Sequence, residues 1–219
     1  MHETTKKSAK DKCLATSRFY HRKFKDIPTF SSDDLVKIPP SDESLILVDV
    51  RTNAETQVSK IEGAVTLKEF EETVAPTLFF SATKSEEEDK VLPKIVTYCT
   101  IGYRSGLEAR RLRDTYRLDG HIYHLEGIIP YTHALGTVKE DSPSVVARQV
   151  VSTEDGTETK TVHSFGGIWG FADSEYSTVH FGPLALVGRL GQVGAMATYR
   201  TGQHIGFELT RCCRREKVH

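Results

Sequence analysis

The sequence lacks the features that identify a membrane protein or a disulfide-stabilised secreted protein. It has no run of about 18 uninterrupted apolar residues, so no transmembrane helix is predicted. Its four cysteines, Cys13, Cys99, Cys212 and Cys213, are too few for a disulfide framework in 219 residues, which favours a reducing intracellular compartment. A net charge of −1 gives no reason to expect nucleic acid or an anionic membrane as the main partner.

The N-terminal segment differs from the rest of the chain in its charge. The first 25 residues contain eight lysines and arginines against two acidic residues, and they lack the apolar segment of a secretory signal. We therefore interpret residues 1–30 as a disordered basic tail. A transit peptide for a mitochondrion or plastid is the open alternative to the cytoplasm, which is the favoured location.

Short apolar runs alternate with amphipathic segments between residues 31 and 135. The runs typical of strands are SLILVDV at 44–50, GAVTL at 63–67, KIVTYC at 94–99 and HIYHLEG at 121–127. Helices are predicted at 53–60 with Asn53 as the cap, from 68 as far as Pro76, and at 105–116. The acidic stretch at 81–90 is typical of a surface loop. Strands that alternate with helices predict an α/β domain with a mainly parallel sheet.

Beyond residue 135 the sequence changes character. Residues 136–160 are polar and turn-rich, apart from the alternating piece SVVARQVV at 144–151. The only tryptophan, Trp169, lies among several other aromatic residues, which suggests packing onto the α/β block. We predict that residues 136–219 form an extension of unassigned fold, partly packed and partly flexible. The adjacent Cys212 and Cys213 are interpreted as incidental, with a role beside Cys99 as the alternative.

The stretch YCTIGYRSG at 98–106 places a cysteine where a buried strand ends and a helix begins. In open α/β sheets, ligands bind at the carboxyl ends of the strands. Backbone N–H groups in such a loop can form an anion-binding nest, to which the helix N-terminus and Arg104 add positive charge. Gly102 allows the tight turn, and this setting favours ionisation of the Cys99 thiol. The loop predicts a nucleophilic cysteine, with an inert buried cysteine as the alternative.

CTIGYRS resembles the active-site loop of single-domain rhodaneses, which are sulfurtransferases. Three further segments resemble parts of that family, in the family's order: LILVDVR at 45–51, ETQVSKIEGAV at 55–65 and HLEGII at 124–129. The resemblance covers about residues 34–135 and implies a parallel sheet of about five strands flanked by helices. The sequence departs from the family at Lys60, where a histidine is common, and at Ile128, which replaces the second glycine of a pair.

The resemblance implies that Cys99 carries a persulfide. The residues expected to bind the sulfur donor and the persulfide are Thr100, Ile101, Gly102, Tyr103, Arg104 and Ser105. Asp49 and Arg51, at the end of another strand, are interpreted as supporting residues. The expected donor is a small anion such as thiosulfate, attracted by Arg104 and the arginines of the next helix, and the acceptor is cyanide in an assay or a thiol in a cell. No metal or organic cofactor is implied.

The family also has phosphatase and arsenate reductase relatives, and loop length separates them from the sulfurtransferases. Their loop places an arginine after five intervening residues, whereas four separate Cys99 from Arg104. Ser105, one residue further on, cannot bind a phosphate bidentately. The shorter loop favours sulfur transfer over phosphatase or arsenate reductase activity. A rhodanese fold used as a binding or regulatory module with little turnover is the other alternative.

Overall fold

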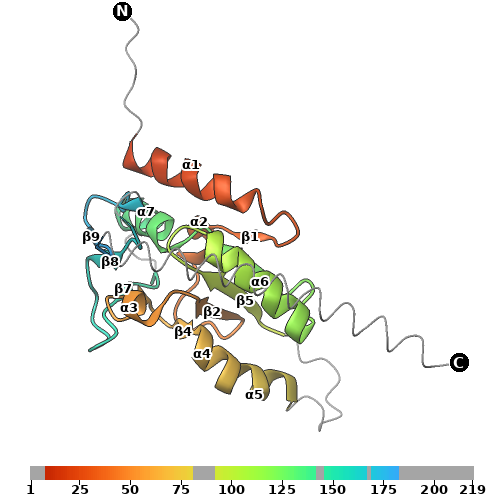
Figure 1. Ribbon diagram of the computed structural model, residues 1–219. Helices are drawn as coiled ribbons and strands as arrows, with labels where there is room; N and C mark the ends of the chain where they lie inside the picture. The colour runs from red at the N-terminus through yellow and green to blue at the C-terminus, as the bar shows by residue number, and fades with distance from the viewer. Residues whose placement is uncertain (1–7, 81–91, 142–145, 167–168, 183–219) are drawn as a thin grey trace, which may run out of the picture. The chain divides into compact units, whose positions relative to one another are not determined.

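The computed structural model describes residues 8–80, 92–141, 146–166 and 169–182 (Figure 1). The predicted surface loop at 81–90 and the pair Cys212 and Cys213 lie outside these ranges. The chain divides into two units, Met1–His180 and Phe181–His219, and the fold described here is that of the first. No helix of the described residues is long and apolar enough to cross a bilayer.

Five parallel strands form the central sheet, in the order β1-β6-β5-β2-β4. They are β1 Thr29–Phe30, β2 Leu45–Asp49, β4 Val65–Thr66, β5 Lys94–Tyr98 and β6 Ile122–Leu125. The central pair is in register over its whole length, from Leu45 opposite Lys94 to Asp49 opposite Tyr98. The prediction of a mainly parallel sheet of about five strands is therefore confirmed.

Helices cover both faces of this sheet, which explains the nearly continuous apolar runs of its central strands. The helical segments are α1 Ala9–His21, α2 Ser32–Leu35, α3 Asn53–Thr56, α4 Leu67–Glu69, the π-helical turn η1 Phe70–Val74, α5 Ala75–Phe80, α6 Tyr103–Tyr116 and α7 Ile128–Asp141. Side chains of β5 alternate between the faces: Val96 and Tyr98 join the core under α7, and Ile95 joins the core under α6. In Figure 1, α1 and α7 lie together above the sheet, and α4 and α5 lie below it.

The N-terminal segment differs from the disordered tail that its charge predicted. Ser8 caps α1 by accepting the Asp11 N–H, and the Asp11 carboxylate accepts the Ser8 N–H in return. The helix buries Cys13 and Ser17 and packs against α6 and α7, and β1 then pairs with β6. The cations lie on the exposed side of α1, so the same charge that suggested disorder is compatible with a packed helix.

Two prolines lie within helices, and only at the first of them, Pro76, did the sequence predict a break. The helix expected to end at Pro76 continues to Phe80, because the wider turn of η1 precedes the proline and closes with a bond from the Ala75 N–H to the Phe70 carbonyl. Pro130 falls in the first turn of α7, where a missing N–H removes no helical bond. The α/β block therefore extends to the end of α7, beyond the predicted limit at residue 135.

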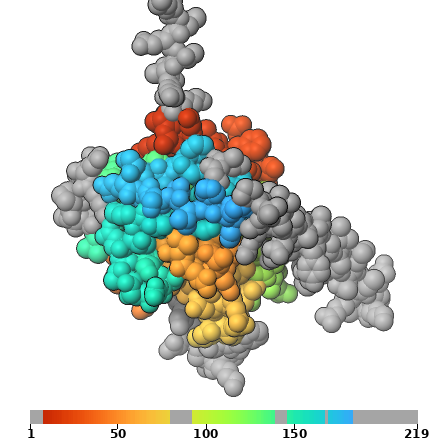
Figure 2. Space-filling model, turned by 60° about the vertical axis from the view of Figure 1, so that its left-hand side comes forward, coloured from red at the N-terminus to blue at the C-terminus, as the bar shows by residue number. Residues whose placement is uncertain are grey.

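The described part of the C-terminal extension packs on the α/β block. Its strand β7 Val150–Val151 pairs antiparallel with β3 Lys60–Ile61, and β8 Thr161–His163 pairs in parallel with β9 Ser177–Val179. Val150, Val162 and Tyr176 are buried in the same apolar core as α7. In Figure 2, residues 150–180 form a teal-to-blue layer between α1 in red and α3 in orange.

Candidate functional site

Cys99 comes directly after β5, at the carboxyl edge of the sheet, and α6 begins four residues later. Its Sγ accepts the Gly102 N–H at 3.2 Å and lies 3.7 Å from the Ser105 Oγ. The residue is 2% exposed, so the thiol lies within the loop rather than on the outer surface. A backbone N–H directed at the sulfur, at the start of a helix, stabilises a negative charge there.

The backbone shape of the loop depends on Gly102 and Ser105. Gly102 has a φ of +100°, and a Cβ at this position would overlap the Nε2 of His21. Ser105 Oγ donates to the Gly102 carbonyl at 3.0 Å, and its own carbonyl accepts the Thr97 Oγ1 hydroxyl. Glycine is therefore required here for two reasons, its positive φ and the close approach of α1.

The N-terminus of α7 supports the loop from a second side. Ile128 and Ile129 donate their N–H groups to the carbonyls of Cys99 and Thr100, at 2.9 and 3.2 Å. A Cβ at Gly127, whose φ is +128°, would collide with the backbone of Thr100 and Ile101. The glycine that precedes Ile128 is thus explained by close backbone contact, and the isoleucine that departs from the family pattern is accommodated.

Arg104 forms a bidentate ion pair with Glu55, with both N–O distances at 2.6 Å. The Glu55 side chain is fully buried, and Arg104 is 14% exposed. Burial alone would raise the pKa of Glu55, but the hydrogen bonds and charge of Arg104 lower it to about 2. Thr100 Oγ1 also donates to Glu55, at 3.1 Å. Arg104 therefore attaches the loop to α3, and its charge, which was expected to attract an anionic donor, is paired with that of Glu55.

The sequence analysis missed Glu55, although a local signal was present. Thr52, rather than the predicted Asn53, is the N-cap of α3. Its backbone N–H and its hydroxyl both donate to the Glu55 carboxylate, at 3.0 and 2.9 Å. The spacing of threonine and glutamate is that of a capping box, whose hydrogen bonds hold the carboxylate of Glu55 in an orientation that Arg104 can also bind.

Comparison with known families shows what this domain is similar to. A family model described as "Rhodanese-like domain" matches residues 32–130. Residues 32–130 belong to the rhodanese-like family. The match begins within α2 and ends within the first turn of α7, so α1 and the layer formed by β7, β8 and β9 lie outside it. No curated protein matches the chain.

Three solved structures show a remote similarity to the chain. A thiosulfate sulfurtransferase from Pseudomonas aeruginosa has a TM-score of 0.38 and 14% identity, covering 68% of this chain and 24% of its own. A Rhodopseudomonas palustris protein of unknown function, described as a possible tyrosine phosphatase, has a TM-score of 0.33 and 23% identity, covering 61% and 96%. A Bacillus halodurans protein has a TM-score of 0.33 and 22% identity, covering 53% and 80%. These similarities are too remote to bear on the activity.

Asp49 and Arg51 form a buried network at the end of β2 in the rhodanese-like domain. The Asp49 carboxylate accepts from Arg51 and from the Tyr98 hydroxyl, each at 2.6 Å. Arg51 also donates to the Ser59 carbonyl, and the Tyr98 hydroxyl accepts the Ile61 N–H. The network joins β2 to β5 and to β3, which is the geometry of structural support. Tyr98 was not predicted, because only the paired strands bring its hydroxyl to Asp49.

The arginines of α6, expected to attract an anionic donor, are held by neighbouring carboxylates. Arg110 and Arg113 both bind Asp26, and Arg111 binds Glu71. The hydrogen bond from Arg110 is the main cause that lowers the pKa of Asp26 to about 2. These side chains therefore connect α6 to its neighbours, and their charge is largely compensated. Among the described residues, no group of three His, Cys, Asp or Glu side chains could hold a metal ion.

Two histidines pack behind the cysteine loop, and the sequence analysis assigned neither of them to it. The rings of His21 on α1 and His124 on β6 lie 4.4 Å apart in an edge-to-face arrangement. Burial lowers the pKa of His21 to about 4. Burial and, after it, the charge of His21 lower the pKa of His124 to about 3. Both rings are therefore neutral at pH 7, and α1 forms the rear wall of the loop.

The C-terminal extension reaches the same loop through Phe165. The Arg104 guanidinium lies over the Phe165 ring, 4.7 Å from its centroid, and the Trp169 ring packs against the Phe165 ring at 5.8 Å between centroids. Phe165 is buried and has a φ of +62°, an uncommon conformation for a residue other than glycine. The part of the chain beyond the family match therefore covers one wall of the site.

Proposed function

We propose that this protein is a sulfurtransferase that carries sulfane sulfur as a persulfide on Cys99. The observation that carries the proposal is the position of the Cys99 Sγ, which accepts the Gly102 N–H at 3.2 Å within a loop at the N-terminus of α6. A persulfide bears its negative charge on the sulfur added to Sγ. The backbone donors and the helix N-terminus would stabilise that charge.

The reaction proceeds in two balanced steps. The Cys99 thiolate attacks the outer sulfur of a small anionic donor such as thiosulfate, the donor's S–S bond breaks, and sulfite leaves with the electron pair. A nucleophilic acceptor, cyanide or a thiolate, then attacks the outer sulfur of the persulfide, and Cys99 leaves as a thiolate. This is covalent catalysis with ping-pong kinetics. Neither step needs an electron donor, an electron acceptor or a metal.

Phosphatase or arsenate reductase activity is the less favoured alternative. Binding a tetrahedral oxyanion bidentately requires an arginine whose guanidinium is available in the loop. The terminal nitrogens of Arg104 both donate to Glu55, which is fully buried. The engagement of Arg104, together with the four-residue spacing from Cys99, supports sulfur transfer instead.

A binding or regulatory module with little turnover is the second alternative, and the low exposure of Cys99 is compatible with it. Steady-state assays of thiosulfate-to-cyanide transfer and of aryl phosphate hydrolysis distinguish the three functions. We expect sulfur transfer by the native protein and none by Cys99→Ser. Cys13→Ala is the matched control, because burial raises the pKa of Cys13 to about 12 and keeps that thiol protonated. Phosphate hydrolysis that rivals sulfur transfer would reverse the ranking, and no transfer at all would favour the module.

A further inference from the structure

Helix α1 and the turn after it carry an uncompensated positive surface. Its members are the exposed residues Lys10, Lys12, Arg18, Arg22, Lys23 and Lys25, which we call the α1 basic face. None of the six forms an ion pair within the described residues. The only carboxylate within residues 8–25 is that of Asp11, which caps the helix. The chain as a whole has a net charge of −1, so this concentration of positive charge is local.

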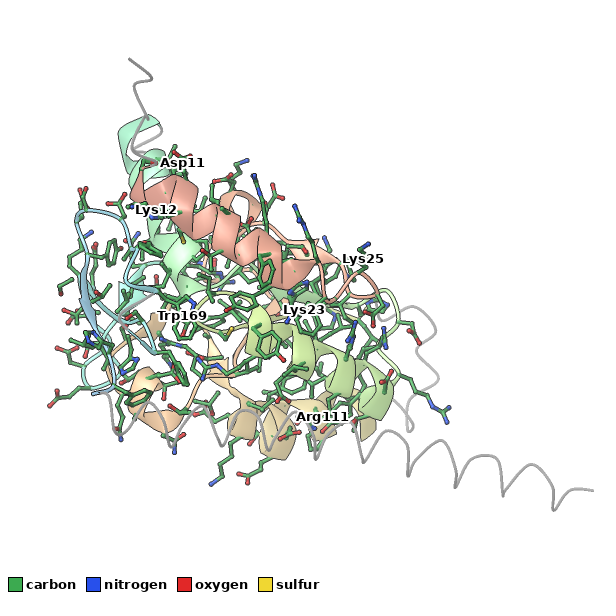
Figure 3. The ribbon with its side chains drawn as sticks, turned by 45° about the horizontal axis from the view of Figure 1, so that its top comes forward. Asp11, Lys12, Lys23, Lys25, Arg111 and Trp169 are labelled. Carbon is green, nitrogen blue, oxygen red and sulfur yellow. The ribbon has the colours of Figure 1, made fainter. Side chains whose placement is uncertain are left out.

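The α1 basic face borders the cysteine loop. Ser17 on the buried side of α1 donates to the Glu126 carbonyl, just beyond the end of β6, so the helix lies at the carboxyl edge of the sheet. The Tyr103 ring of the loop lies 5.6 Å from the Tyr20 ring, and the Lys23 Nζ lies 5.4 Å from the centroid of Tyr103. Figure 3 shows Lys12 near the start of α1, and Lys23 and Lys25 at its far end.

An exposed aromatic side chain lies within this face. Phe19 is 58% exposed, and it is one of three large hydrophobic side chains that are exposed among the described residues. The Lys23 Nζ lies 5.7 Å from the centroid of the Phe19 ring, so the same ammonium group is close to both Phe19 and Tyr103. Aromatic residues and arginine are enriched in protein interfaces, where an aromatic side chain supplies buried area. Lysine is not enriched there, and the charges of the face as a whole act by steering a partner of opposite charge and by setting specificity.

The chemistry of the face favours an acidic protein over a lipid surface or a nucleic acid. A helix that lies on a membrane needs a free apolar side, but α1 uses its buried side, with Cys13 and Ser17, against the domain. A nucleic-acid-binding domain is typically basic overall, whereas this chain has a pI of about 6.8. An acidic protein needs neither a free apolar side on α1 nor a basic chain, because its carboxylates can pair with the six cations directly.

We propose that the α1 basic face docks an acidic protein that receives sulfur from Cys99. This inference rests on the function proposed above. Carboxylates of the partner bind the cations of α1, and its cysteine reaches the loop beside Tyr103. The partner's thiolate attacks the outer sulfur of the Cys99 persulfide, the S–S bond to Sγ breaks, and Cys99 leaves as a thiolate while the partner holds the persulfide.

Two matched peptide acceptors test this proposal on the full-length chain. Each contains one cysteine, flanked by four glutamates in one peptide and by four glutamines in the other. We expect kcat/KM for the acidic peptide to exceed that for the neutral peptide by about 10-fold at low ionic strength, and the difference to disappear at high salt. Fluorescence anisotropy of a labelled acidic peptide measures docking separately from turnover.

Charge reversal locates the effect on the surface. Arg18→Glu/Arg22→Glu/Lys25→Glu should weaken binding of the acidic peptide by about 10-fold or more, while thiosulfate-to-cyanide transfer at saturating substrate stays within about twofold. The control Lys37→Glu/Lys68→Glu/Lys94→Glu changes three exposed lysines outside α1 and should leave peptide binding unchanged.

Equal losses in both triple variants, or equal use of the two peptides, would overturn the docking proposal. Tighter binding to anionic phospholipid vesicles or to single-stranded DNA than to the acidic peptide would also overturn it, in favour of those partners. If the native chain transfers no sulfur to cyanide, the proposed function fails, and the anisotropy measurement still reports whether the face binds acidic peptides.

Discussion

The Glu55 carboxylate stabilises the cysteine loop, although the two are far apart in the sequence. Its two oxygens accept five hydrogen bonds, from Arg104, Thr52 and Thr100. A buried ion pair of this kind recovers the cost of desolvation only while both partners are present. Removal of one partner leaves the other without compensation inside the protein.

We therefore predict that Glu55→Gln destabilises the fold and disrupts the conformation of the cysteine loop. Removing one member of a buried pair costs about 3–5 kcal/mol, and some exposure of Arg104 places this case near the lower end. Chemical unfolding measures the change in free energy of unfolding. The control Glu72→Gln removes an exposed carboxylate that lies 3.9 Å from Lys68 and should cost less than about 0.5 kcal/mol. Similar values for the two variants would contradict the role given to Glu55.

Gly102 and Gly120 provide a matched pair of substitutions at positive φ. Gly102→Ala combines a strained φ of +100° with a clash against His21, whereas a Cβ at Gly120, at φ +80°, meets nothing within 4 Å. Gly120→Ala should therefore cost about 1 kcal/mol through backbone strain alone. Gly102→Ala should cost clearly more and abolish sulfur transfer. Equal stability losses, with full transfer by Gly102→Ala, would show that close packing of α1 on the loop is unimportant.

At the scale of the secondary-structure elements, α1 and β6 contribute the neutral histidine pair behind the loop. The pKa values of His21 and His124 are lowered by burial to about 4 and about 3, below the 6.5 of an unfolded histidine. Between pH 6.5 and 4 the unfolded chain therefore binds more protons at these residues than the folded chain does. The stability that both rings contribute is complete above pH 6.5 and decreases as the pH falls through this interval.

Urea unfolding between pH 8 and 4.5 tests this dependence. Each histidine should add a slope of at most about 1.4 kcal/mol per pH unit below pH 6.5. His21→Gln/His124→Gln should flatten the curve in that interval, whereas His180→Gln, which changes an exposed ring, should leave the slope unchanged. An identical slope in the double variant and the native chain would contradict the claim that His21 and His124 are held as buried, neutral rings behind the loop.

Sequence reasoning at this scale succeeded where the signal was local. The strands β2, β5 and β6 were predicted from apolar runs, and the cysteine loop was predicted from its position between a strand and a helix. The helix α1 was missed because the basic residues that suggest disorder occupy only its exposed side. The Arg104–Glu55 ion pair was missed because it joins residues 49 positions apart, and no local pattern near Arg104 indicates its partner.

At the scale of the whole molecule, residues beyond the family match complete the core and the wall of the site. Val150, Val162 and Tyr176 of the extension lie in the core formed with α7. His133 on α7 forms a hydrogen bond of 2.7 Å to the Phe171 carbonyl of the extension. Phe165, also in the extension, packs against the Arg104 guanidinium. The rhodanese-like domain in this chain therefore depends on the C-terminal extension for part of its core.

A chain that ends at residue 142 should consequently be strongly destabilised. Full burial of an apolar side chain contributes about 1.5–3 kcal/mol, and several such side chains are lost together, against a typical domain stability of about 5–15 kcal/mol. Thermal unfolding of the truncated chain measures this loss, and the point variant Val162→Ala, expected to cost about 2 kcal/mol, gives a milder test within the intact chain. A truncated chain with native stability and native sulfur transfer would show that the extension only lies beside the domain.

The central claim is that Cys99 holds the transferred sulfur, and mass spectrometry of the thiosulfate-treated protein tests it most directly. After treatment, alkylation and proteolysis, the account predicts one added sulfur atom on the peptide that contains Cys99. Subsequent addition of cyanide should remove it, and Cys99→Ser should show no such product. An unmodified Cys99 peptide after thiosulfate treatment of an otherwise folded protein, or the added sulfur on a different cysteine, would contradict the account.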